Sequence, residues 1–317
     1  MKRIYVGIDI GSVSINVSVL NAQKEVLKDY YLRMEGKPLE RTYKILKEVF
    51  TLYPKEQIKG LAATGSGGKL LAKILNIPFV NEILAQTKST GYLHPEIKTT
   101  IEIGGEDSKF ILTDYDESLG MHVIKDFAMN TICAAGTGSF LDQQAARLGL
   151  SIEEFGELAL RSEKPPRIAG RCSVFANTDM IHLQQEATPD YDIVAGLCFA
   201  LARNFKSIIA KGKKFIKPIS FQGGVAANKG MIRAFRETLE LKDSELIVPK
   251  YFASMGAIGS ALTLIDGTNR IRAYNDLEEI NRYLKTHKEE HKVLELLEEP
   301  KRKITKHAWL EAEIIKG

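Results

Sequence analysis

The reactive side chains of this chain fall into two groups, three cysteines and several acids set in glycine-rich turns. Cys133 precedes a glycine-rich turn and a predicted helix, where the helix dipole and unpaired N–H groups stabilise a thiolate. That position favours a ligand or a nucleophile, while the alternative is a small cysteine packed under a turn. Cys198 lies in an apolar helical stretch and is expected in the core.

Two predicted strands each end in an acid and a glycine turn, at residues 7–14 and 103–108. Glycine in such a turn lets backbone N–H groups approach an anion such as a phosphate. Two acids facing each other across a cleft suit Mg²⁺, which takes one or two carboxylates together with the phosphates of its substrate. We therefore expect Asp9 and Asp107 to bind Mg²⁺.

Two further glycine turns, at residues 136–138 and 221–228, complete a set of four. A single glycine pair is weak evidence, because turns between strands use glycine anyway. Four in this order, two of them with acids, indicate a site for ATP or ADP, and no P-loop motif is present. The expected nucleotide contacts are Gly11, Ser12, Ser14, Gly104, Gly105, Gly136, Thr137, Gly138, Gly223, Gly224, Ala226 and Asn228.

The elements that position these turns repeat along the chain. A strand–turn–strand–strand unit begins near residue 4 and another near residue 99, and helices follow each copy. This pattern predicts an internal duplication with a cleft between the halves. The expected parts are a first lobe, a second lobe with the cysteines, a helix that returns to the first lobe, and a charged helical tail, at residues 1–96, 97–252, 253–265 and 266–317.

Further helices are expected in the second lobe and beyond it, at residues 138–148, 173–186, 191–211, 228–240 and 254–265. Strands are expected at residues 216–222 and 246–248. The tail combines many charges with few apolar residues, so we expect one or two solvated surface helices, broken near Pro300. A docking role for the tail is the alternative.

Composition excludes several classes of protein. The net charge of +4 is close to balanced, and no basic run alternates with aromatic residues, so nucleic acid is not an expected partner. No stretch approaches the roughly 20 apolar residues of a membrane span. The first residues do not resemble a signal peptide, and three scattered cysteines do not form a disulfide framework. We therefore expect a cytoplasmic protein.

The glycine turns resemble those of the actin-like ATPase superfamily, which includes heat-shock proteins and sugar kinases. Within this superfamily, the cysteine-containing segments at residues 130–142 and 172–176 resemble those of the activators of 2-hydroxyacyl-CoA dehydratases and the ATPase subunits of benzoyl-CoA reductase. The resemblance covers about residues 3–265. It implies an α/β, duplicated actin-like (ribonuclease H-like) fold, with two lobes around a nucleotide cleft and a C-terminal helical extension.

In that family two cysteines per subunit hold one 4Fe–4S cluster at a homodimer interface, and ATP drives a conformational change that passes an electron to a partner metalloenzyme. The resemblance implies that Cys133 and Cys172 are the ligands. A 4Fe–4S cluster normally takes four thiolates, and two per chain reach that number only by two-fold symmetry. Zinc is the competing metal, but no tight ligand spacing appears.

The implied partners are a second copy of the chain, an iron–sulfur reductase or dehydratase as acceptor, and an upstream ferredoxin or flavodoxin as donor. The predicted helix after Gly138 joins the cysteine segment to the phosphate turns. A small shift at the γ-phosphate would then re-aim the helices that carry the cluster.

This chain departs from the family in two places. Glu106 stands where the family commonly has Gln, so Glu106 either acts as a base beside Asp107 in hydrolysis or completes a metal shell. Residues 177–179 read Asn-Thr-Asp instead of the usual Glu-Ser, which resembles the activase-like branch serving double-cubane-cluster proteins.

Two other functions stay open. An amino-sugar kinase of the same superfamily would use an acid such as Asp107 as base toward a sugar hydroxyl, and it would leave Cys133 and Cys172 without a role. A nucleotide-gated scaffold would use the tail as its docking arm.

Overall fold

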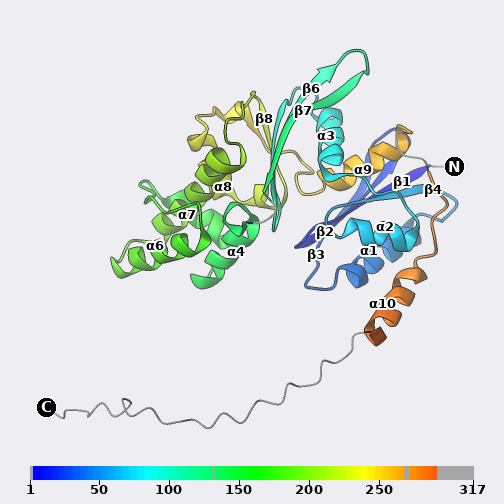
Figure 1. Ribbon diagram of the computed structural model, residues 1–317, viewed down its shortest axis with the longest axis horizontal. Coiled ribbons are helices and arrows are strands. Elements are labelled where there is room, and N and C mark those ends of the chain that lie inside the picture. Colours follow the sequence, from blue (N-terminus) through cyan, green and yellow to red (C-terminus); the bar gives the residue numbers. More distant parts are fainter. Residues whose placement is uncertain (1–2, 131–132, 268–270, 291–317) are drawn as a thin grey trace, which may run out of the picture.

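The computed structural model describes residues 3–130, 133–267 and 271–290. Figure 1 shows two lobes, each built on one sheet with helices packed against it. The helix α3 (Glu82–Leu93) and the helix α9 (Met255–Ile265) lie in the region where the lobes meet.

The first lobe has a four-stranded sheet in the order β3-β2-β1-β4. Its strands are β1 (Ile4–Ile10), β2 (Ser14–Asn21), β3 (Val26–Arg33) and β4 (Ile58–Thr64). The strand β1 pairs antiparallel with β2 and parallel with β4, and almost all of its residues are buried because both faces of the sheet are covered. The helices α1 (Pro38–Leu52) and α2 (Gly68–Leu75) belong to this lobe.

The second lobe repeats this arrangement in a five-stranded sheet in the order β7-β6-β5-β8-β9. Its strands are β5 (Thr99–Ile103), β6 (Ser108–Asp116), β7 (Met121–Asn130), β8 (Ile219–Gln222) and β9 (Leu246–Ile247). The strand β5 pairs antiparallel with β6 and parallel with β8, as β1 does with β2 and β4. The shared pairing confirms the predicted duplication.

The helices of the second lobe form its largest apolar core together with β5, β6 and β8. They are α4 (Gly138–Arg147), α5 (Ile152–Leu158), α6 (Ser173–Gln185), α7 (Asp190–Asn204) and α8 (Lys229–Thr238). The helix predicted to reach residue 211 ends as an α-helix at Asn204 and continues as a π-helical turn to Ile209. The strand predicted from residue 216 begins at Ile219, because Pro218 has no N–H for the ladder.

The helix α9 packs against α3 and β1. Two glycines permit this close approach. A Cβ atom added to Gly259 would stand 1.8 Å from the carbonyl oxygen of Ala85, and one on Gly7 would stand 1.8 Å from that of Ala257.

Part of the tail is packed rather than solvated. The helix α10 (Glu278–Glu290) contacts α1 and α2, and Ile280 is fully buried in the core of the first lobe. The expectation of a solvated appendage is therefore wrong for this helix. The predicted break near Pro300 lies outside the described residues. Within the described part of the chain, no helix is long and apolar enough to cross a bilayer.

Candidate functional site

A cleft of about 990 Å³ is lined by residues of both lobes and contains most of the predicted nucleotide site. The turn between β1 and β2 faces the turn between β5 and β6, and both acids, Asp9 and Asp107, line the space. The other predicted residues that line it are Gly11, Ser12, Ser14, Gly104, Gly105, Glu106, Gly138, Gly223, Gly224 and Asn228.

Three predicted contacts lie elsewhere. Gly136, Thr137 and Ala226 are buried and are not part of the cleft lining. The N–H of Gly138 donates to the carbonyl oxygen of Gly104 at 2.9 Å. The turn at residues 136–138 therefore supports the loop between β5 and β6 from behind. Within this turn, only Gly138 lines the cleft.

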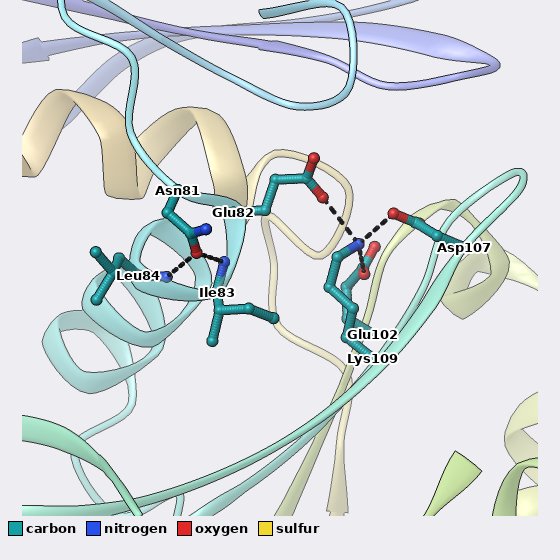
Figure 2. Close-up of polar contacts among 7 residues, drawn as sticks. All are labelled: Asn81, Glu82, Ile83, Leu84, Glu102, Asp107 and Lys109. Carbon is teal, nitrogen blue, oxygen red and sulfur yellow. Dashed lines mark hydrogen bonds and ion pairs between the residues drawn. The ribbon is translucent and has the colours of Figure 1, made fainter. Parts of the chain in front are cut away.

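The most strongly charged part of the cleft surrounds Lys109, whose side chain is only 3% exposed. Its Nζ lies 2.7 Å from Glu102 Oε2, 2.7 Å from Asp107 Oδ2 and 3.1 Å from Glu82 Oε2 (Figure 2). Asn81 fixes the start of α3, because its side chain accepts hydrogen bonds from the N–H groups of Ile83 and Leu84, as Figure 2 shows. One ammonium thus joins α3 to the second sheet.

Burial and mutual repulsion alter the protonation of these groups. Burial, followed by repulsion from Glu82 and Glu102, raises the pKa of Asp9 to about 7. Burial also raises the pKa of Glu102 to about 7, although Lys109 opposes the rise. For Lys109 burial favours the neutral amine, but the surrounding carboxylates outweigh it and raise the pKa. The cleft therefore holds more carboxyl groups than cationic groups. A cation bound there would reduce their repulsion and favour their ionised forms.

Several buried polar atoms in the cleft have no hydrogen-bond partner among the described residues. They are Asn16 Oδ1, Thr64 Oγ1, Gln86 Oε1 and Asn228 Nδ2. Buried polar atoms are normally paired, so these atoms indicate a polar ligand. Of these four residues, sequence patterns predict only Asn228. The segment at residues 64–68, a threonine before a glycine-rich turn, carried a signal that could have revealed Thr64.

No group of three or more His, Cys, Asp and Glu side chains within residues 3–130, 133–267 and 271–290 is arranged to hold a metal ion by itself. Mg²⁺ needs no such group, because it uses one or two carboxylates and the phosphates of a nucleotide. Asp9 and Asp107 both line the cleft and fit that requirement.

The three cysteines have different surroundings. Cys198 is fully buried, as predicted, and burial raises its pKa to about 12, although Arg233 opposes the rise. Cys133 is exposed and Cys172 is partly exposed. Cys133 precedes a 3-10 turn that leads into α4, and Cys172 is the N-cap residue of α6. Only these two cysteines present thiols that an external group can reach.

The side chain of Asn130 holds the backbone of Cys133 in place. Asn130 Nδ2 donates to the carbonyl oxygen of Cys133 at 2.7 Å, and the Cys133 N–H donates to Asn130 Oδ1 at 3.1 Å. The residues that depart from the family pattern also have structural partners. Asn177 accepts a hydrogen bond from Arg147, which joins α4 to α6, and Asp179 accepts one from the N–H of Ala169 at 2.7 Å.

Comparison with known proteins places this arrangement in a family. Residues 6–263 match the BadF/BadG/BcrA/BcrD ATPase family. The 2-hydroxyisocaproyl-CoA dehydratase activator of Clostridioides difficile is 30% identical over 263 residues, which cover 82% of this chain and 94% of that protein.

Solved structures agree. The crystal structure of the Acidaminococcus fermentans (R)-2-hydroxyglutaryl-CoA dehydratase component A has a TM-score of 0.76 at 28% identity, covering 84% of this chain and all of that one. The Clostridium difficile 2-hydroxyisocaproyl-CoA dehydratase activator with bound ADPNP has a TM-score of 0.70 at 26% identity, covering 93% of this chain and all of that one. The chain has the predicted actin-like ATPase fold and belongs to the BadF/BadG/BcrA/BcrD ATPase family.

Proposed function

We propose that this chain is an ATP-hydrolysing electron donor that passes low-potential electrons to a partner metalloenzyme. The observation that carries the proposal is a direct hydrogen-bonded contact between the nucleotide cleft and the segment of Cys133. The N–H and the hydroxyl of Ser139 both donate to the carbonyl oxygen of Gly105, at 2.8 and 2.6 Å. Together with the bond from Gly138 to Gly104, they fix the start of α4 to the loop that faces the phosphates.

This contact gives ATP a mechanical route to the cysteines. A shift of the loop at residues 104–107 displaces the first turn of α4, and packed elements respond to such a shift by moving as units. The bond between Arg147 and Asn177 extends the connection to α6, which begins just after Cys172. Both cysteine segments are therefore joined to the loop that senses the nucleotide.

The cleft residues supply the binding of the nucleotide and its cation. We propose that Asp9 and Asp107 hold Mg²⁺, directly or through its waters, and that the backbone N–H groups of the glycine turns bind the phosphates. Glu106 is exposed at the same turn, where its carboxylate can orient a water for hydrolysis. The unpaired atoms of Asn16, Thr64 and Gln86 provide further polar contacts.

Cys133 and Cys172 are the proposed ligands of a 4Fe–4S cluster, which supplies one-electron chemistry when bound. Two accessible thiols per chain match half of the four that such a cluster takes, so the second half comes from another copy. Large apolar side chains stand exposed on the elements next to the cysteines, as expected for a surface that a second copy covers. They are Phe127, Met129, Val174, Phe175 and Ile208.

The names of the relatives indicate which class of enzyme accepts the electrons. Three relatives are called activators or activating ATPases of 2-hydroxyacyl-CoA dehydratases, so we propose a dehydratase or a related iron–sulfur reductase as the acceptor. A ferredoxin or flavodoxin is the proposed electron source, and the cytoplasm the proposed compartment.

The test compares two cysteine variants after anaerobic purification and chemical reconstitution. Cys133→Ala should lose the brown chromophore and bound iron while keeping ATP binding, because Cys133 does not line the nucleotide cleft. Cys198→Ala is the matched control and should keep the chromophore, since Cys198 is in the core. A full cluster in Cys133→Ala, or a colourless wild-type protein that phosphorylates a sugar, contradicts the proposal.

A further inference from the structure

A second, smaller cavity of about 290 Å³ lies beside Cys133 and shares only Met129 with the lining of the nucleotide cleft. Its lining combines apolar side chains with three nitrogen donors, and the residues are Met129, Asn130, Cys133, Arg171, Asn204, Ile208 and Ile209. Arg171 is the chain neighbour of Cys172, so the segment of the second accessible cysteine reaches this cavity, although Cys172 itself does not line it. The proposed function uses the two thiols but assigns nothing to the donors around them.

Asn204 is a buried residue whose side chain lines the cavity. It ends α7, is only 5% exposed, and makes no side-chain hydrogen bond to the described residues. Its Nδ2 lies 3.6 Å from the point where a Cβ atom on Gly136 would stand, so Asn204 packs beside the turn that follows Cys133. An amide that lines the cavity without a partner among the described residues is available to donate to a group bound beside Cys133.

Arg171 and Asn130 differ in whether their side chains already have partners among the described residues. Arg171 is exposed and forms no ion pair within the described part of the chain. The side-chain amide of Asn130 is hydrogen-bonded to the backbone of Cys133 through both Nδ2 and Oδ1. Asn130 therefore positions Cys133, while Asn204 and Arg171 line the same cavity with donors that have no acceptor among the described residues.

We propose that Asn204 and Arg171 donate hydrogen bonds to the sulfur atoms of the group held by Cys133 and Cys172, and thereby raise its reduction potential. This inference rests on the proposed function and assigns roles to two residues beyond it. Hydrogen bonds to the sulfurs and a nearby positive charge stabilise the more negative, reduced form. Of the apolar neighbours, Ile209 is buried, and a low local dielectric on that side of the cavity strengthens these contacts.

The test is anaerobic spectroelectrochemistry of the full-length chain, with iron and sulfide content measured on each sample. Asn204→Leu and Arg171→Gln should each shift the midpoint potential to a more negative value than that of the wild type. Asn204→Asp should shift it further, because a carboxylate replaces a donor. Arg171→Lys should stay close to the wild type, since the charge and a donor remain. Arg161→Gln removes an arginine outside the cavity lining and is the matched control.

The outcomes separate the two levels of the proposal. Equal cluster content with an unchanged potential in both Asn204→Leu and Arg171→Gln overturns the inference and leaves the proposed function standing. If Asn204→Leu does not fold, the exposed Arg171 and its two variants decide. A wild-type protein that takes up no cluster on reconstitution overturns the proposed function and this inference together.

Discussion

At the scale of single residues, the charge cluster around Lys109 is the feature that most constrains the cleft. Lys109 and Glu102 are almost fully buried, and the ammonium is shared by three carboxylates. Ion pairs on a surface contribute little, because water screens them and the side chains lose entropy. A buried pair behaves differently, because removal of one partner leaves an uncompensated charge.

Lys109→Met should therefore lower the free energy of unfolding by about 3–5 kcal/mol, as expected when one partner of a buried pair is removed. Lys213→Met is the control, because the pair of Lys213 with Asp126 is partly exposed, and its loss should cost about 1 kcal/mol or less. Denaturant unfolding without nucleotide measures both. Equal losses in the two variants would show that Lys109 is not held in a buried network.

The raised pKa values of Asp9 and Glu102 predict a pH dependence of stability. Their pKa values rise from the ordinary 3.8 and 4.5 to about 7 in the fold. The native state therefore binds more protons than the unfolded state between these limits, and the free energy of unfolding should fall as pH rises from about 4.5 to about 7. Denaturant midpoints across this range, without nucleotide or divalent cation, measure it.

Asp9→Asn isolates the contribution of that residue, because an amide does not titrate and the fall in stability with pH should become smaller. A variant whose pH dependence equals that of the wild type would show that Asp9 ionises at its ordinary pKa.

The sequence revealed Asp9 and Asp107 because each stands in a glycine turn at the end of an apolar strand. Glu102 and Lys109 gave no such signal, because they alternate with apolar residues inside strands and meet only when β5 pairs with β6. Asn16 and Gln86 reach the cleft from β2 and α3 and likewise lack a local motif. Apart from Thr64, which precedes a glycine-rich turn, the cleft residues that sequence patterns missed are thus those placed by tertiary pairing.

At the scale of elements, the contact of α4 with the loop at residues 104–107 is the proposed coupling between the two sites. The contact is made by the carbonyl oxygens of Gly104 and Gly105, and sequence patterns do not reveal which backbone carbonyls accept such bonds. The helix α4 itself was predictable from its apolar face and the glycine that follows it at position 149. The direction of its contacts was predicted less well, since Gly136 and Thr137 support the loop instead of facing the cleft.

Ser139→Ala removes the hydroxyl bond to Gly105 and should weaken the coupling by about 1 kcal/mol, roughly a fivefold effect. In cluster-free protein, a non-hydrolysable ATP analogue should change the alkylation rate of Cys133, and the change should be smaller in the variant. Ser118→Ala, which removes a hydroxyl bond to Asp116 in the distant β6–β7 hairpin, should leave that change intact. An identical change in wild type and Ser139→Ala would refute this route.

The packing of α9 against α3 gives a second test at this scale. Gly259→Ala places a methyl group 1.8 Å from the carbonyl oxygen of Ala85, so the helices must move apart at a cost of about 1–3 kcal/mol or more. Gly224→Ala is the control, since nothing lies within 4 Å of its added Cβ atom. Thermal or denaturant unfolding of the nucleotide-free protein measures the difference, and equal stability would contradict the close packing.

At the scale of the whole molecule, the duplicated lobes were predictable because the same strand pattern occurs twice in the sequence. The packing of α10 against the first lobe was not predictable. Its many charged residues suggested an exposed helix, and only a few apolar residues, such as Ile280, pack into the core. The proposed arrangement of two chains around one cluster follows from ligand number. Two accessible cysteines per chain supply half of the four thiolates that a 4Fe–4S cluster takes, so a second copy is the proposed source of the other two.

Native mass spectrometry of the anaerobically reconstituted protein tests this central claim most directly. We predict one species of two chains with four irons and four sulfides, as required for one shared 4Fe–4S cluster. Cys133→Ala and Cys172→Ala should each lack the iron and sulfide, and Cys198→Ala should match the wild type. A single chain that carries a complete cluster, or a wild-type dimer that carries none after reconstitution, would contradict the account.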